Sequence, residues 1–515
     1  MLSKLFSAVL YGIEALPVEV EVDLSQGLPL LNIVGLPDPA VKESKDRVRS
    51  ALKNTGFHFP VKKITINLAP ADLKKEGSAF DLPMALGILV ADGVLNVDRL
   101  QDYLVVGELS LDGRIKEIRG ALALAILAKK AGKRGLIIPA RNAPEAAVVA
   151  GIEVLGAETL PQVVEFLNGG TALGRTALVP VETSLPDLFA DQVLFLEDFS
   201  EVRGQAHAKR ALEIAAAGGH NLLMVGPPGS GKTMLAKRFP TILPNMNFEE
   251  AIETTLVHSI FGLLPDRPLV VTRPFRSPHH TVSDAGLIGG GQVPRPGEVS
   301  LAHNGVLFLD EIPEFRRNVL EVLRQPLEEG KVTIARASAS LTYPAQFMLV
   351  AAMNPCPCGY LTDPARSCSC APTAIRRYRA RVSGPLLDRI DLHIEVPAVP
   401  YRALSQGGEE EPSEAIRARV FAARKVQQAR YEKEGIRCNA QLRPRQIKKY
   451  CSIDDPSRRL LDLAIERLGL SARAYNRILK VARTIADLER RDLISATDIS
   501  EAVQYRSLDR RIAAG

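Results

Sequence analysis

The chain has 515 residues, of which 46% are hydrophobic, 24% charged and 5% aromatic, and its formal net charge is +6. This composition excludes a collagen-like, low-complexity or disordered chain, and the length allows two to four domains of about 100–200 residues each. No apolar run approaches the ~18 residues that a membrane span needs, and six cysteines are too few for a disulfide framework. We therefore expect a cytoplasmic protein without a membrane partner.

The N-terminal third alternates short apolar strands with helical patterns, as in a two-layer α/β domain. Strands are expected at residues 18–24, 30–36, 63–69, 103–111 and 135–140. Helices are expected at 39–56 and 120–132, each ending at a glycine that can cap it. The start of the chain reads as mature protein and not as a signal peptide, because Glu14 and an alternating strand pattern follow its short apolar stretch.

These patterns divide the chain into four parts. We expect an α/β domain at 1–172, a linker rich in Gly, Pro and Thr at 173–197, a second α/β domain at 198–400, and an almost purely helical segment at 401–515. The helical segment carries 24 Lys and Arg against 16 Asp and Glu. That excess fits a polyanionic partner, and a solvated helical face explains it equally well.

A phosphate-binding loop is predicted where the second domain begins. Residues 221–233 read NLLMVGPPGSGKT, which is an apolar strand followed by the pattern GxxxxGK[ST] and a helix. The loop and its continuation are Gly226, Pro227, Pro228, Gly229, Ser230, Gly231, Lys232 and Thr233. Glycines let backbone N–H groups close around phosphates, Lys232 should reach the outer phosphates, and the Thr233 hydroxyl should ligate Mg²⁺.

Two further apolar strands end in polar side chains. GVLFLDE (305–311) delivers Asp310, which should hold Mg²⁺, and Glu311, which is placed to polarise an attacking water. FMLVAAMNP (347–355) ends in Asn354, whose amide can position the same water. The alternative for Asn354 is a turn residue at a strand end before proline.

Together these strand ends resemble Walker A, Walker B and sensor-1 of the AAA+ ATPases. The preceding stretch, 198–221, is similar to the AAA+ segment that flanks the adenine, and Val202, Gly204 and Gln205 match it. The resemblance implies a P-loop α/β core with a parallel sheet, binding ATP with Mg²⁺. No guanine-specific NKxD pattern is present, which disfavours a small GTPase.

The stretch RPGEVSLAHNGVLFLDE (295–311) is similar to the magnesium-chelatase and MCM helicase group of AAA+ proteins. By the same resemblance, Arg336 lies on a hairpin that faces DNA, Arg389 is the arginine finger, and Arg473 is the sensor-2 arginine of a helical lid. A finger acts on a neighbouring subunit's γ-phosphate, so Arg389 implies a ring. The alternative for Arg389 is a surface pair with Asp388 or Asp391.

Residues 73–89 and 107–146 resemble the Lon-type protease domain, which uses a serine nucleophile and a lysine. The alignment puts Ala79 at the nucleophile, with Ser78 one place early. It puts Ile118 at the lysine, with Lys116 two residues away. We therefore expect an inactive Lon-protease-like α/β domain.

This order of parts covers the chain and resembles the YifB/ComM family of magnesium-chelatase-like AAA+ ATPases. The family implies a homohexameric, DNA-stimulated motor that drives branch migration in homologous recombination, notably in natural transformation. Two alternatives are a chelatase-type motor that remodels a partner protein and an ATP-dependent protease.

Four cysteines crowd into fifteen positions of CPCGYLTDPARSCSC. They are Cys356, Cys358, Cys368 and Cys370. Four thiolates so close in sequence could form a tetrahedral structural Zn²⁺ site, although their spacing is CxC and not the common CxxC. Free thiols and a redox pair are the alternatives. The adjacent His279 and His280 read as polar loop residues.

Overall fold

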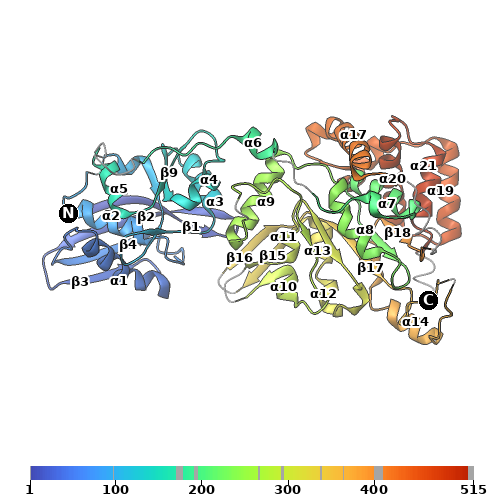
Figure 1. Ribbon diagram of the computed structural model, residues 1–515, viewed down its shortest axis with the longest axis horizontal. Helices are drawn as coiled ribbons and strands as arrows, with labels where there is room; N and C mark the ends of the chain where they lie inside the picture. The colour runs from blue at the N-terminus through green and yellow to red at the C-terminus, as the bar shows by residue number, and fades with distance from the viewer. Residues whose placement is uncertain are drawn as a thin grey trace. The chain divides into compact units, whose positions relative to one another are not determined.

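A computed structural model describes residues 2–96, 98–169, 178–190, 195–264, 267–291, 295–336, 339–363, 365–399 and 410–508. Contacts divide the chain into two units (Figure 1). The first unit contains Met1–Gln192 and Ala251–Val271, and the second contains Val193–Glu250 and Thr272–Gly515. The boundary falls inside helix α9 (Phe248–Phe261), so part of the predicted second domain groups with the first unit.

The first unit is built on a seven-stranded mixed sheet with the order β3-β4-β2-β1-β5-β8-β9. Its strands are β1 (Leu2–Tyr11), β2 (Glu14–Ser25), β3 (Leu30–Val34), β4 (Lys63–Ala69), β5 (Tyr103–Val105), β8 (Gly135–Pro139) and β9 (Glu153–Ala157). β1 and β2 form a long antiparallel hairpin, and β2 alternates buried valines with outward carboxylates. A separate small hairpin joins β6 (Glu108–Leu109) to β7 (Ile115–Lys116).

Helices cover both faces of part of this sheet, so the expected two-layer arrangement is wrong there. Along β8, Ile137 belongs to one apolar cluster and its neighbours Leu136 and Ile138 belong to another. Successive strand residues point to opposite faces, and a strand that is apolar at every position must be covered on both. The unit's helices are α1 (Pro39–Asn54), α2 (Asp81–Ala91), α3 (Ala121–Lys130), α4 (Ala143–Ala146) and α5 (Leu160–Leu167).

Helix α2 is buried along its whole length and lies against the β1–β2 hairpin. This close approach depends on Gly87. A Cβ atom at Gly87 would lie 2.6 Å from Val22 Cγ2 and 3.0 Å from Leu5 Cδ1. Gly87 therefore lets the middle of α2 pack directly on the side chains of the hairpin.

The second unit contains a five-stranded parallel sheet with the order β11-β14-β17-β10-β18. Its strands are β11 (Phe275–Arg276), β14 (Val306–Leu309), β17 (Met348–Met353), β10 (Leu222–Val225) and β18 (Leu392–Glu395). All residues of β10, β14 and β17 are buried, as expected for central strands of a parallel sheet. The predicted parallel α/β core is confirmed.

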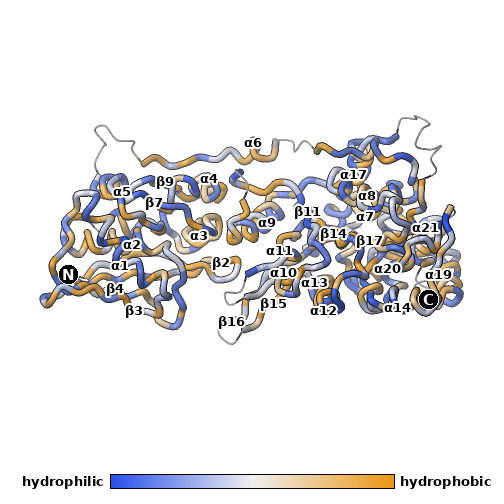
Figure 2. The backbone as a smooth tube through the Cα atoms, turned by 60° about the horizontal axis from the view of Figure 1, so that its bottom comes forward, coloured by the Kyte–Doolittle hydropathy of each residue, from blue (hydrophilic) through white to orange (hydrophobic). Residues whose placement is uncertain are grey.

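The C-terminal segment is helical, as predicted. It contains α17 (Ser413–Tyr431), α18 (Pro444–Tyr450), α19 (Asp455–Leu468), α20 (Ala472–Leu488) and α21 (Ala496–Gln504). These lid helices mix hydrophilic and hydrophobic residues along their length (Figure 2). The apolar side chains of α17 and α20 share one cluster with α7 (Ala206–Gly218) and the sheet.

The described chain also contains shorter helices and strands outside the two large sheets and the C-terminal helices. They are α6 (Leu185–Ala190), α8 (Lys232–Arg238), α10 (Asp284–Ile288), β12 (Gly289–Gly290), β13 (Arg295–Pro296), α11 (Glu298–Leu301), α12 (Arg317–Glu321), α13 (Arg324–Glu329), β15 (Lys331–Arg336), β16 (Ala339–Pro344), α14 (Pro372–Arg379) and α15 (Gly384–Leu387). Among the described residues, no helix is long and apolar enough to cross a membrane.

Candidate nucleotide site

The predicted phosphate loop lies between β10 and α8. A Cβ atom at Gly226 would lie 2.1 Å from the carbonyl oxygen of Val396, so a side chain cannot be accommodated there. Gly231 has φ +89°, in the left-handed region that favours glycine. These two constraints let the chain turn sharply from the strand into the helix, with backbone N–H groups of the loop preceding the N-terminus of α8.

Lys232 opens α8, and its ammonium group contacts oxygens of the loop. Nζ donates to the carbonyl oxygens of Gly226 and Pro227, both at 2.8 Å, and lies 3.3 Å from Asn354 Oδ1. Burial lowers the pKa of Lys232, and the charges of Asp310 and Glu311 oppose that shift. A buried ammonium among oxygen acceptors suits an anionic phosphate group.

A hydroxyl and a carboxylate meet at the same edge of the sheet. Thr233 Oγ1 donates to Asp310 Oδ2 at 2.6 Å, and the other carboxylate oxygen of Asp310 accepts from the Glu311 N–H at 2.9 Å. Hard oxygen donors of this kind fit Mg²⁺, which binds through one or two carboxylates and phosphate oxygens.

Glu311 follows Asp310 in a backbone conformation that is unusual for its residue type. Its φ is +50°, and its side chain is exposed. Non-glycine residues in this region carry strain and cluster at functional sites. Four other described non-glycine residues share a positive φ, so the conformation marks Glu311 only together with its position directly after Asp310.

Asn354 directly follows β17, the strand between β10 and β14. Because all three strands are parallel, their carboxyl ends lie at one edge of the sheet, where ligands bind in such folds. The structure therefore brings together Lys232, Thr233, Asp310 and Asn354, as the sequence predicts. Their catalytic roles stay predictions.

The three residues expected to flank the adenine lie in different environments. Val202 is fully buried in the hydrophobic cluster. The Gly204 N–H donates to Glu410 Oε1 at 2.8 Å. Gln205 Nε2 donates to the carbonyl oxygen of Pro397 at 2.7 Å and lies 3.4 Å from that of Ser230. Gln205 thus ties this segment to the phosphate loop, a connection that the sequence did not reveal.

Arg389 is buried, with 6% of its surface exposed. Its guanidinium forms an ion pair with Glu328 and donates to the carbonyl oxygen of Pro385. The partner is therefore Glu328 and not Asp388 or Asp391. Burial lowers the pKa of Arg389, and the charges of Arg324 and Arg473 act in the same direction. These three arginines are close enough to interact electrostatically, although Arg473 itself is exposed.

Arg336 ends β15 and pairs with Ala339 of β16 in an antiparallel hairpin. The predicted hairpin is present, and the side chain of Arg336 lies outside the described residues.

In the first unit, Ser78 donates a hydrogen bond to Glu108, and Lys116 lies opposite Glu108 in the β6–β7 pair. A carboxylate next to Ser78 is not the lysine on which Lon-type catalysis depends.

The four clustered cysteines converge. Their Sγ atoms all lie within 4.8 Å of one another, and Cys356 is buried. The other two cysteines, Cys438 and Cys451, are buried elsewhere as free thiols.

The adjacent histidines lie in a loop. His279 Nδ1 shares a hydrogen bond with Thr281 Oγ1 at 2.9 Å, and the ring centroids of His279 and His280 are 4.0 Å apart.

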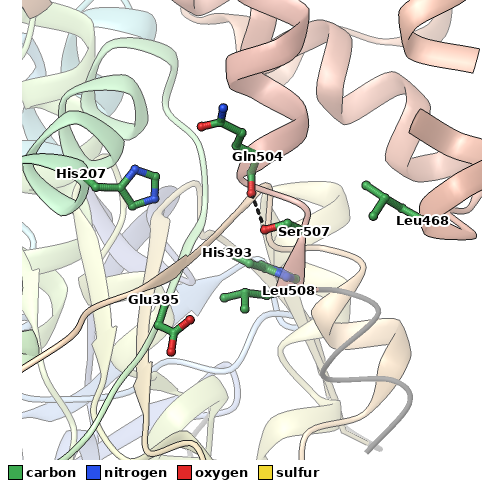
Figure 3. A pocket seen from close by; sticks show the side chains of 7 residues that line it. All are labelled: His207, His393, Glu395, Leu468, Gln504, Ser507 and Leu508. Atoms are coloured by element: carbon green, nitrogen blue, oxygen red, sulfur yellow. Dashed lines mark hydrogen bonds between the residues drawn. The ribbon is translucent and has the colours of Figure 1, made fainter. Parts of the chain in front are cut away.

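A pocket of about 370 Å³ lies beside β18, and sequence reasoning singled out none of its residues. It is lined by His207, His393, Glu395, Leu468, Gln504, Ser507 and Leu508 (Figure 3). Ser507 Oγ donates to the carbonyl oxygen of Gln504 at 2.8 Å, and the His207 ring stacks on Tyr505. The lining comes from the sheet edge and three helices, which no sequence motif connects.

Comparisons with known proteins agree with this geometry. Family models described as magnesium chelatase subunit ChlI match residues 198–404 and 20–142, and a model of the ChlI C-terminal part matches 410–506. The chain is 48% identical to competence protein ComM of Haemophilus influenzae over 510 residues, covering 99% of this chain and 98% of the relative.

A second relative matches at nearly full length, and a third over part of the chain. A YifB protein of Escherichia coli is 45% identical over 99% of this chain and 98% of its own length. The magnesium-chelatase 38 kDa subunit of Rhodobacter capsulatus is 28% identical over 177 residues, which are 30% of this chain and 50% of that subunit. The three family models and the near-full-length identities agree with the nucleotide-site geometry. We conclude that the chain belongs to the YifB/ComM family of magnesium-chelatase-like AAA+ ATPases.

Proposed function

We propose that this chain hydrolyses Mg²⁺-ATP as a homohexameric ring and uses the energy to move along DNA. Its task would be branch migration during homologous recombination in natural transformation. The observation that carries the ATP-hydrolysing part of the proposal is the meeting of Lys232, Thr233, Asp310 and Asn354 at one edge of the parallel sheet. A protein with this task would act in the cytoplasm.

Hydrolysis needs charge stabilisation and an oriented water more than covalent chemistry. Lys232 binds the outer phosphates, while Thr233 and Asp310 hold Mg²⁺, which would neutralise charge on the phosphate oxygens. Glu311 polarises the attacking water, and the Asn354 amide positions it. The contact between Asn354 and Lys232 supports this assignment, because side chains so close together could reach one phosphate group.

The ring is inferred from two arginines. Arg389 and Arg473 interact electrostatically although 84 positions separate them in sequence, which supports a shared positive face. In a ring that face would meet the neighbour's γ-phosphate, and the ion pair between Arg389 and Glu328 would have to exchange for the phosphate. The carboxylate of Glu328 would then neutralise Arg389 in the absence of the neighbour's γ-phosphate.

DNA as substrate is supported by the relative named competence protein ComM and by the basic helical segment. Arg336, at the end of β15, would contact the phosphate backbone and not base edges, giving salt-dependent and sequence-tolerant binding. A second candidate is a motor that remodels a partner protein, favoured by the ChlI family models.

The decisive measurement is the ATPase rate with single-stranded DNA, duplex DNA, a four-way junction or no DNA. We expect several-fold stimulation by DNA, strongest with the branched substrate, and loss of turnover in Lys232→Ala. ATP hydrolysis without any response to DNA would favour the partner-remodelling motor. Equal turnover in the wild type and Lys232→Ala would contradict the nucleotide site itself.

A further inference from the structure

The four clustered thiols have distances that suit a metal ion. Sγ of Cys356 lies 3.3 Å from Sγ of Cys358 and 3.6 Å from Sγ of Cys368, and the last two are 3.5 Å apart. Sulfurs around a tetrahedral zinc with Zn–S of about 2.3 Å lie about 3.8 Å apart. A disulfide brings its sulfurs to about 2.05 Å. The observed distances are much closer to the first arrangement.

The surrounding backbone is arranged for thiolates. The Cys358 N–H points to Cys370 Sγ at 3.3 Å, and the Cys370 N–H points to Cys368 Sγ at 3.4 Å. Donors of this kind orient sulfur ligands and stabilise their negative charge. A zinc ion with four thiolates carries a net charge of about −2, and the Arg379 guanidinium lies close enough to Cys356 for their charges to interact.

We propose that Cys356, Cys358, Cys368 and Cys370 bind one Zn²⁺ as thiolates, releasing four protons, and that the resulting zinc knot holds the ATP site in shape. The metal would be structural, because four protein ligands leave no open position for substrate or water. The second part of the proposal rests on the proposed ATPase function, and the first part does not.

The knot contacts both sides of the nucleotide site. Asn354 precedes Cys356 by two residues, and the intervening Pro355 carbonyl accepts a hydrogen bond from Arg379 Nε at 3.1 Å. On the other side, Gly359 lies against the phosphate loop: a Cβ atom there would be 2.5 Å from Pro228 Cδ. The segment 355–359 thus connects the end of β17 to the phosphate loop, and its conformation affects the distance between them.

Metal content tests the site directly. Full-length protein purified without added metal should contain about one zinc per chain by elemental analysis, and a mercurial reagent should release that zinc as four thiols react. Cys368→Ser and Cys370→Ser should each lower zinc content at least tenfold, whereas Cys438→Ala, a buried cysteine outside the cluster, should retain it. Wild-type protein without zinc, or with iron in its place, would overturn the proposal. So would equal zinc loss in Cys438→Ala.

Coupling to the ATP site needs a variant that keeps the metal. Gly359→Ala leaves all four ligands in place but puts a methyl group against Pro228 and strains a backbone with φ +86°. We expect ATP turnover at least tenfold lower in the fraction of this variant that still carries zinc, which elemental analysis of the same sample measures. Unchanged turnover would overturn the coupling. Because zinc is counted independently of turnover, a zinc-loaded protein that hydrolyses no ATP contradicts the proposed function alone, and a metal-free, DNA-stimulated ATPase contradicts the zinc site alone.

Discussion

At the scale of single residues, substitutions of Glu311 and Lys232 should impair ATP hydrolysis at different steps. A general base typically contributes 10²–10⁴-fold to a rate, so Glu311→Gln should lower ATP turnover about a hundredfold or more while ATP still binds. Lys232→Ala should lose the binding itself, since Lys232 supplies the ammonium among the loop oxygens. Nucleotide affinity measured by calorimetry beside turnover separates the two. Near-normal hydrolysis in Glu311→Gln would assign the water to another group.

The buried carboxylate of Asp391 offers a test of stability. Arg477 Nη1, on α20, lies 3.0 Å from Asp391 Oδ1, and the Asn221 N–H donates to the other oxygen. Burial works to raise the pKa of Asp391, but Arg477 and His220 outweigh it and hold that pKa below its ordinary range. The pair fastens the lid helix to the strand that follows Asp391.

Removing one partner of a buried pair leaves an uncompensated charge, so Arg477→Met should lower the free energy of unfolding by about 3 kcal/mol at neutral pH. A carboxyl group whose pKa is lowered by folding stabilises the folded state only while it is ionised. The difference from wild type should therefore shrink as the pH falls from about 4 toward the lower pKa of the folded state. Denaturant unfolding across pH measures this. Arg473→Met, an exposed change on the same helix, is the control, and an equal effect there would contradict the ion-pair account.

At the scale of elements, the hairpin of β15 and β16 carries the DNA prediction. Arg336→Ala should weaken DNA stimulation several-fold and reduce the salt dependence of binding, with DNA-free ATPase nearly intact. Lys331→Ala, at the opposite end of the same strand, is the matched control. If both variants retain full stimulation, the DNA contact lies elsewhere, for example at Arg276 or the loop 289–291.

The elements show what sequence can predict. Strand-end motifs located Thr233, Asp310 and Asn354 correctly relative to one another, because parallel central strands are apolar throughout and must end at one edge. β1 and β9 were missed. The first was read only as a short apolar stretch, and its role as partner of β2 depends on a hairpin that forms around Gly12. The segment 103–111 was predicted as one strand but divides into β5 and β6.

Contacts between distant segments that no motif marks could not be predicted. Glu328 and Arg389 are 61 residues apart, and no periodicity links them. The approach of Gly359 to Pro228 likewise depends on the fold of the cysteine loop. The pocket beside β18 draws residues from four elements, each of which has an ordinary local sequence.

At the scale of the whole molecule, the proposed role of Arg389 as an arginine finger predicts complementation between subunits. Arg389→Ala protein has an intact phosphate loop, and Lys232→Ala protein has an intact finger. Each is expected to hydrolyse little ATP alone, but mixed rings can contain a complete site and should recover a measurable fraction of wild-type turnover. The double variant Arg389→Ala/Lys232→Ala mixed with Lys232→Ala cannot build such a site. Proven subunit exchange without recovery would count against Arg389 as the finger.

The division of the chain within α9 has a consequence for biosynthesis. Ser259 donates a hydrogen bond to the buried Glu145, and both belong to the first unit, so that unit is assembled from two separated stretches. Proteins emerge from the ribosome N-terminus first. The first unit therefore cannot be completed when only its first stretch, Met1–Gln192, has been translated. It must wait until the phosphate loop and residues 251–271 have also left the exit tunnel, and until then Glu145 lacks the hydrogen bond from Ser259.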